Sequence, residues 1–179
     1  PAVWEALLPT MPMTALVRNL NTLTRLGVLT PLSERTKNVV ERLTNRTLLK
    51  AARLHPLTIL VAQKIYAQGR GDKGSTAWTP LTAVSDALNE AFYLAFDAVR
   101  PTNKRWMFGL DVSGSMSAPV CGSPLSCCEA ATALSLVTTR VEPWTFTGRF
   151  NTGFESVPFG RTTRLDDALR YTRNINGGG

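Results

Sequence analysis

The sequence predicts two structural parts: stacked α-helices over residues 1–102, as in an α-solenoid, and a doubly wound α/β domain over 103–179. Three observations predict this division. Apolar residues recur at helical spacing before Thr102, a short apolar run typical of a buried strand follows it, and strand and helix patterns then alternate. The change of pattern places the boundary near 102–104.

The first predicted helix follows Pro12, and its apolar residues recur every three or four positions up to Gly27. Proline suits the first turn of a helix, and glycine suits the position after its C-terminal end. Because the residue before a proline avoids the helical region, His55-Pro56 separates the third helix from the fourth. The other helices of this series, one of them capped by Asn45, are predicted over 33–43, 45–52 and 57–69.

A longer helix is predicted after Thr79-Pro80, with threonine as the cap and proline in the first turn. Its apolar face continues for about five turns, and Pro101 ends it. Helices that follow one another without strands favour an α-solenoid, although the self-similarity along the chain is too weak to define a repeat.

The second part is predicted to begin with a strand over 104–110, whose continuous apolar run is typical of burial on both faces. Ser123-Pro124 is predicted to open the next helix. The remaining elements are two strands joined as a hairpin and a last helix, predicted over 144–150, 154–159 and 165–172. This order of strands and helices is that of a doubly wound α/β domain.

The composition excludes several classes of protein. With 44% hydrophobic and 18% charged residues, the chain is expected to fold rather than to be disordered. No stretch approaches the roughly 20 apolar residues that span a bilayer, and the N-terminus lacks the order of a secretory signal. The three cysteines cannot all pair within the chain and lack zinc-ligand spacing. We therefore expect a reducing, cytoplasmic location and no membrane partner.

Positive charge is concentrated in one part of the chain. The formal net charge is +7, and residues 1–73 hold eleven Lys and Arg against four acids, whereas residues 74–179 balance to zero. A basic face on one part suggests a polyanionic partner, and solvated helix faces are the alternative.

Three of these cations are candidate phosphate contacts: Arg18, Arg25 and Lys64. Arginine offers a planar fork of donors and lysine a point charge. Arg18 and Arg25 lie two turns apart, and therefore on one face of the predicted helix. For each of them a solvated or ion-paired surface role is the alternative.

A cluster of oxygen-bearing side chains follows the first predicted strand, at the edge where open α/β sheets bind ligands. It reads Asp111-Val112-Ser113-Gly114-Ser115. If the loop stays extended, its alternating carboxylate and hydroxyls face one point, and Mg²⁺ prefers such ligands. We therefore expect Asp111, Ser113 and Ser115 to bind Mg²⁺ or another divalent cation, with a helix-capping turn as the alternative.

This D-x-S-x-S pattern resembles the first motif of the metal-ion-dependent adhesion site (MIDAS) in von Willebrand factor A domains. Residues 11–20 are similar to the Met-Pro-x-Thr-Ala-x-x-Arg-Asn-Leu segment of the Ro ribonucleoprotein autoantigen family, the TROVE module. Further segments that match this family in the same order are Arg53-Leu54-His55-Pro56, Ala91-Phe92-Tyr93, Pro101-Thr102-x-Lys104-Arg105 and Val137-x-Thr139-Arg140. The resemblance runs over essentially all 179 residues.

The resemblance implies the last helices of a ring of HEAT-like repeats over 1–102 and the first part of a von Willebrand factor A-type domain over 103–179. It also implies binding of small noncoding Y RNAs and misfolded RNAs, with roles in RNA quality control and stress survival. The family's metal site takes a threonine and an aspartate from later loops, so the site is expected to be incomplete where this sequence ends, at Gly177-Gly178-Gly179. The main RNA contacts are expected before Pro1.

Two functions other than RNA binding are compatible with parts of the sequence. A protein-interaction module could capture a partner's carboxylate through the metal ion, without any role for RNA. A metal-assisted hydrolase would need a second ligand cluster or a general base near the ion, and the sequence shows neither, so we expect no enzyme activity. His55 is expected to support a turn between helices rather than to contact RNA. Asn19 is expected to hydrogen-bond a neighbouring helix terminus, with a base of the RNA as the alternative.

Overall fold

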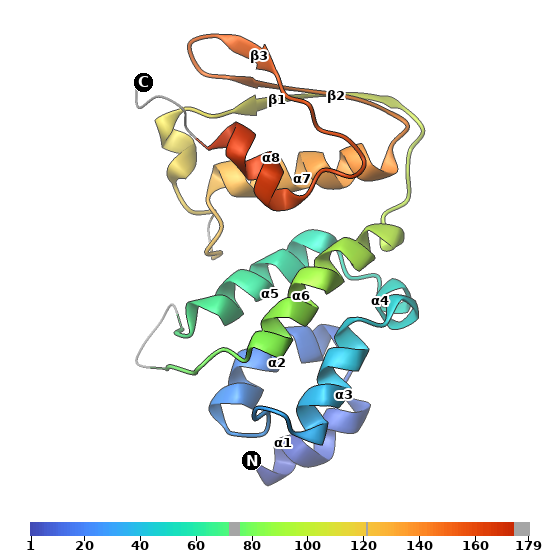
Figure 1. Cartoon of the computed structure of the whole chain (residues 1–179), viewed down its shortest axis with the longest axis vertical. Helices are drawn as coiled ribbons and strands as arrows, with labels where there is room; N and C mark the ends of the chain where they lie inside the picture. The colour runs from blue at the N-terminus through green and yellow to red at the C-terminus, as the bar shows by residue number, and fades with distance from the viewer. Residues whose placement is uncertain (72–75, 121, 174–179) are drawn as a thin grey trace. The chain divides into compact units, whose positions relative to one another are not determined.

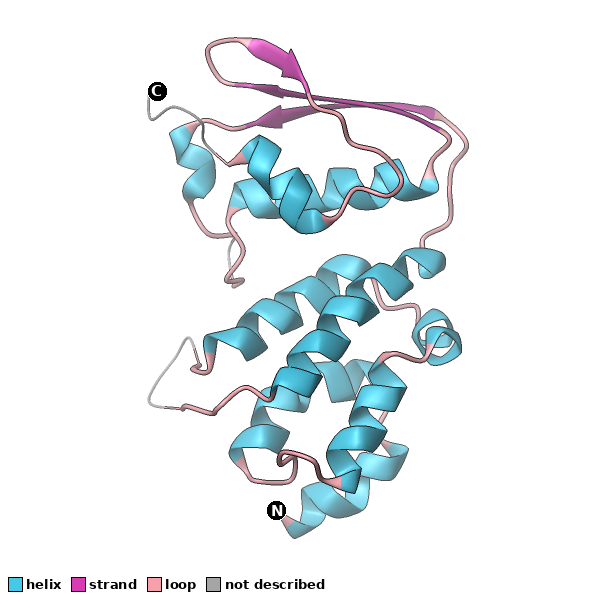
Figure 2. Ribbon diagram, viewed as in Figure 1, coloured by secondary structure: helices cyan, strands magenta, loops and turns pink. Residues whose placement is uncertain are grey.

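The computed structural model describes residues 1–71, 76–120 and 122–173. It divides the chain into two compact units, Pro1–Ala98 and Val99–Gly179. In Figures 1 and 2 the described part of the first unit is built of helices, and the second combines a sheet with helices. Residues 72–75, Cys121 and residues 174–179, which include Gly177-Gly178-Gly179, lie outside the described residues.

The first unit contains the helices that the apolar spacing predicted, together with one short helix at its beginning. Their bounds are α1 Ala2–Leu7, α2 Met13–Arg25, α3 Glu34–Leu43, α4 Arg46–Ala52, α5 Pro56–Gln68 and α6 Thr82–Leu94, with the 3₁₀ turns η1 Leu8–Thr10 and η2 Ala95–Ala98. The prediction of a helical part is confirmed, whereas a HEAT-like repeat stays a prediction.

Side-chain caps explain where several of these helices begin. The Ser33 hydroxyl accepts the Thr36 N–H at 3.2 Å, and the Asn45 side chain accepts the Leu48 N–H at 3.0 Å. Such caps satisfy donors that the first turn of a helix leaves unpaired.

The prediction that Thr79-Pro80 caps α6 was wrong, because the cap is Leu81 and α6 begins at Thr82, two residues later than predicted. The backbone of Leu81 is extended, and its N–H donates to the Tyr66 hydroxyl at 3.1 Å. A tertiary hydrogen bond to α5 therefore delays the start of this helix.

The core of the first unit lies where α6 packs against α3, α4 and α5. Leu88 and Phe92 of α6 are almost completely buried, and the ring of Phe92 meets Phe96 edge-on at 5.0 Å between centroids. Edge-to-face packing of this kind suits the quadrupoles of aromatic rings.

Arg42 of α3 ties the start of the chain to this core. Its guanidinium donates to the carbonyl oxygens of Leu8, at 2.8 Å, and Met11. These carbonyls belong to the turn between α1 and α2, so a cation counted as part of a basic face serves structure instead.

The second unit contains a three-stranded sheet in the order β1–β2–β3, with β1 and β2 parallel and β3 antiparallel to β2. The strands are β1 Arg105–Asp111, β2 Trp144–Phe150 and β3 Phe154–Ser156, and the helical elements are η3 Gly114–Ser117, α7 Cys127–Val141 and α8 Leu165–Thr172. The predicted α/β order is confirmed.

Burial of the first strand on both faces was wrong for the described residues. Figure 1 shows α7 and α8 on one side of the sheet, and Met107 of β1 remains 69% exposed on the other. Trp144, Phe146 and Phe154 are likewise exposed. Apolar composition alone therefore did not distinguish a strand that packs against helices on one face from a strand that is buried on both faces.

Two further boundaries in this unit differ from the prediction. The helix opens at Cys127 rather than at Ser123-Pro124, because Ser126 and Glu129 form a reciprocal capping box. The third strand ends at Ser156: Val157 still donates to Thr147 at 2.9 Å, but Pro158 has no N–H to continue the ladder.

A buried carboxylate fixes the beginning of the second unit. Glu142, directly after α7, is 3% exposed, and its Oε1 accepts the Thr102 N–H at 2.6 Å and the Thr102 hydroxyl at 2.7 Å. Its Oε2 accepts the Asn103 N–H at 2.9 Å. This cluster holds the residues that lead into β1.

Among the described helices, none is both long and apolar enough to cross a bilayer.

Candidate functional site

The oxygen-bearing motif lies where β1 ends and a tight turn begins. Asp111 is the last residue of β1, and η3 starts at Gly114, so the loop does not stay extended as the sequence-based argument required. The turn nevertheless gathers the side chains. The Ser113 N–H donates to Asp111 Oδ1 at 2.8 Å, and the hydroxyls of Ser113 and Ser115 lie 3.0 Å apart.

The electrostatics of this cluster keep the carboxylate charged. The hydrogen bonds from the backbone and side chain of Ser113 lower the pKa of Asp111 below its usual value, although burial opposes them. Asp111 is therefore ionised at neutral pH. One carboxylate and two hydroxyls are hard oxygen donors of the kind that Mg²⁺ binds while it retains water.

The wider surroundings offer few other ligands. No group of three or more His, Cys, Asp or Glu side chains within the described ranges could hold a metal ion. A hollow of about 260 Å³ lies beside Ser113 and is also lined by Glu129 and Arg173. Sequence reasoning did not place Glu129 there, although its Ser-x-x-Glu capping pattern was visible; that carboxylate accepts the Ser126 N–H at 3.1 Å.

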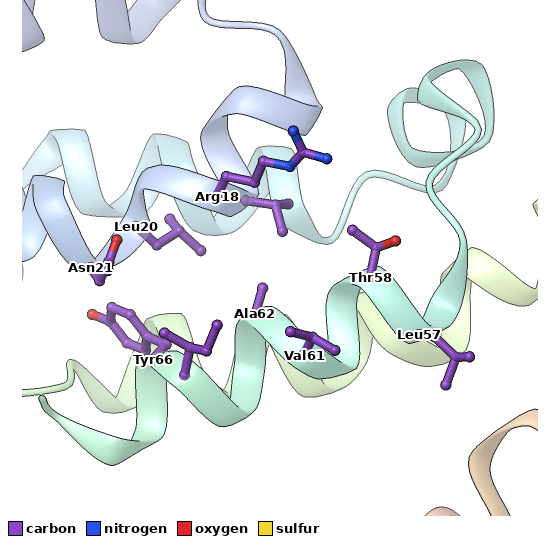
Figure 3. Close-up of a pocket in the computed structure, with 10 residues that line it drawn as sticks. Arg18, Leu20, Asn21, Leu57, Thr58, Val61, Ala62 and Tyr66 are labelled. Carbon is purple, nitrogen blue, oxygen red and sulfur yellow. The ribbon is translucent and has the colours of Figure 1, made fainter. Parts of the chain in front are cut away.

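The three candidate phosphate contacts all lie on two neighbouring helices. Arg18 and Arg25 are exposed residues of α2, and Lys64 is a half-buried residue of α5. Of the three, only Arg18 lines the groove between these helices, as Figure 3 shows. The structure thus brings the candidates onto one pair of helices without gathering them at a single point.

Several other cations of the first unit are paired with acids. The ion pairs are Arg35–Glu5 at 3.2 Å, Lys37–Glu34 at 2.6 Å and Arg46–Asp97 at 3.1 Å. Within the described residues, no acidic side chain forms an ion pair with Arg18 or Arg25. The charge available to a polyanion is therefore smaller than the Lys and Arg count suggests.

Asn19 and His55 both have structural roles, although Asn19 differs from the prediction in its partner. Asn19 Nδ2 donates to the Ala15 carbonyl at 2.8 Å within α2. His55 caps α5, since its Nδ1 accepts the Leu57 N–H at 3.2 Å. The interpretation of His55 is confirmed, whereas Asn19 bonds within its own helix and not to a neighbouring helix terminus.

Two known families match this chain, one in each of its two units. The TROVE domain matches residues 1–65, and the Ro60 vWA domain matches residues 105–179. The "RNA-binding protein RO60" of Caenorhabditis elegans is 43% identical to this chain over 177 residues, and that of Deinococcus radiodurans is 44% identical over 182 residues. The chain belongs to the Ro60 family.

The Ro60-family chain corresponds to part of each relative. It is covered to 98% and 99% by these two matches, but spans only 27% and 34% of the relatives' own lengths. The solved structure of the Deinococcus radiodurans RO (RSR) protein superposes with a TM-score of 0.91 at 43% identity, over 99% of this chain and 36% of that one. Both curated relatives are named as RNA-binding proteins and not as enzymes.

Proposed function

We propose that this chain binds RNA through its helical unit, as its relatives are named for doing. The observation that carries the proposal is the charge on α2 and α5. These two helices hold Arg18, Arg25 and Lys64 and contain no Asp or Glu. Cationic side chains on helices that carry no acids of their own attract the phosphate backbone irrespective of RNA sequence.

We propose further that the RNAs are small noncoding Y RNAs and misfolded RNAs, and that the chain acts in RNA quality control and the stress response in the cytoplasm. The family resemblance supports this finer assignment. The protein's part is recognition and not catalysis, which agrees with the absence of any enzyme name among the relatives cited above.

Salt dependence tests the RNA-binding proposal. If Arg18, Arg25 and Lys64 each contact a phosphate of a single-stranded RNA, the affinity of the full chain should fall roughly twentyfold between about 50 and 200 mM salt. Fluorescence anisotropy with a labelled single-stranded RNA measures this slope. Arg18→Gln should lower both affinity and slope, whereas Lys50→Gln on α4, which removes the same charge elsewhere, should change neither. A slope near zero for the unmodified chain would contradict the proposal.

We propose that Asp111, Ser113 and Ser115 contribute to a divalent-cation site in the second unit. The ionised carboxylate and the hydroxyl pair at 3.0 Å support this assignment. When bound, Mg²⁺ would supply a positive charge that attracts an acidic group. A partner's carboxylate could then bind there, which is the alternative function of the chain, a protein-interaction module.

Removing the Asp111 carboxylate tests the metal assignment. Isothermal titration with Mg²⁺ should show an affinity at least about tenfold weaker for Asp111→Ala than for the unmodified chain, because one negatively charged ligand is lost. Asp166→Ala removes an exposed carboxylate from the first turn of α8 and should leave Mg²⁺ binding unchanged.

The same variant separates the two functions. RNA affinity of Asp111→Ala should stay within about twofold of the unmodified value, since the phosphate contacts lie in the other unit. Loss of RNA binding by a folded Asp111→Ala protein would show that this division of roles is wrong.

A further inference from the structure

An apolar groove of about 410 Å³ runs between α2 and α5. Its volume lies in the range of small-ligand sites, roughly 300–1,000 Å³. Its polar lining residues are Arg18 and Asn21 of α2 and Thr58 and Tyr66 of α5, and in Figure 3 the Arg18 guanidinium lies at the edge of the groove and points away from α5. The other lining residues are aliphatic: Val17, Leu20, Leu57, Val61, Ala62 and Ile65.

Two almost completely buried side chains form the floor of the groove. Leu20 and Tyr66 are each 1% exposed. The Tyr66 hydroxyl lies 2.9 Å from the Thr24 hydroxyl and accepts the Leu81 N–H at 3.1 Å, so its ring is fixed between α2 and the start of α6. A fixed apolar floor can receive a flat ligand without first reorganising.

The rim of the groove is polar and positively charged. Arg18 is exposed and forms no ion pair within the described residues. The side-chain oxygen Oδ1 of Asn21 accepts the Thr22 N–H at 2.8 Å. The side-chain N–H₂ group of Asn21 is left to donate elsewhere. The groove thus combines apolar walls, one amide donor and one arginine, between helices that lack acids.

We infer that this groove holds one unpaired nucleobase of a single-stranded RNA, with the flanking phosphate on Arg18. The inference rests on the proposed RNA-binding function. A base presents an apolar face to aliphatic walls and hydrogen-bonding edges to Asn21 and Thr58, and its phosphate complements the arginine. A paired base is stacked within a duplex and cannot enter unless it is flipped out, so the groove selects single strands.

Filling the groove tests the inference in the full chain. Ala62→Phe places a ring inside it, whereas Ala67→Phe makes the same change at an exposed position of α5 that does not line it. Affinity for a labelled single-stranded decaribonucleotide should fall about tenfold for Ala62→Phe, as expected for loss of one base contact, and less than about twofold for Ala67→Phe. Affinity for a duplex of the same length should not change with either variant. Equal single-strand affinities for the two folded variants would overturn the inference.

A second measurement needs no variant, and it tests the groove assignment even if Ala62→Phe fails to fold. Decaribonucleotides that carry one abasic site, moved along the strand, are compared with the intact strand on the unmodified chain. A loss of about tenfold at a favoured position supports the inference, and equal affinities for all abasic strands overturn it. Suppose that the affinity of the intact strand falls with salt as proposed above, but that every abasic strand binds with the same affinity as the intact strand. In that case the assignment of the groove is wrong and the proposed RNA binding still stands. If no RNA binds at low salt, the proposed function fails with it.

Discussion

Leu88→Ala is expected to lower the free energy of unfolding of the helical unit by about 2–5 kcal/mol. Leu88 lies on α6, has no exposed surface, and sits in the helix that packs against α3, α4 and α5. Truncation removes apolar burial and leaves a cavity that the surrounding helices cannot fully close. Native-state hydrogen exchange of the α6 amides measures this loss without interference from the α/β unit.

Leu48→Ala provides the matched control, because it is the same chemical change at a side chain that is 42% exposed on α4. Its effect should stay below about 1 kcal/mol. A similar small loss at Leu88 would mean that α6 does not form the centre of the helical core.

Glu142→Gln is expected to lower the melting temperature of the α/β unit at neutral pH by several degrees. The glutamine has the same shape, but its amide N–H₂ must face one of the donors that the carboxylate now accepts from Thr102 and Asn103. A buried donor would then be left without an acceptor, which is costly. Thermal melting followed by circular dichroism at pH 7 checks the shift, and Asp166→Asn, at an exposed site, should leave it unchanged.

The same hydrogen bonds predict the pH dependence. Burial raises the pKa of Glu142, but the hydrogen bonds from Thr102 and Asn103 outweigh it, so the pKa in the folded chain lies below the ordinary value of 4.5. A lowered folded pKa means that the stabilisation is complete above 4.5 and is lost as pH falls through the folded value. The difference between the unmodified chain and Glu142→Gln should therefore shrink below pH 4.5. A difference that stays constant over this range would contradict the assignment.

Local signals were sufficient for most elements of the fold. The spacing of apolar residues predicted α2 to α5, and Asn45 and His55 occupy the capping positions that their side chains suit. The short helix α1 was missed because its six residues carry no side-chain cap, and so short a helix is not stable alone. It depends on tertiary contacts, among them the ion pair between Glu5 and Arg35.

The candidate sites were predictable to different degrees. The D-x-S-x-S motif follows the strand directly, so its position at the end of β1 could be read from neighbouring residues. The pairing of α2 with α5 could not, because the residues that line their groove lie about forty positions apart in the chain and share no pattern. For the same reason, Arg42 and Arg18 looked equivalent as charges, although one binds backbone carbonyls and the other lines the groove.

The sequence by itself determined the order of the helices and strands, the motif at the end of β1 and the family, because each depends on residues close together or on segments in a fixed order. Tertiary structure alone decided where α6 begins, that Glu142 holds the residues leading into β1, and which face of the sheet is covered. These features depend on hydrogen bonds and packing between residues distant in sequence, and such contacts exist only once the chain has folded.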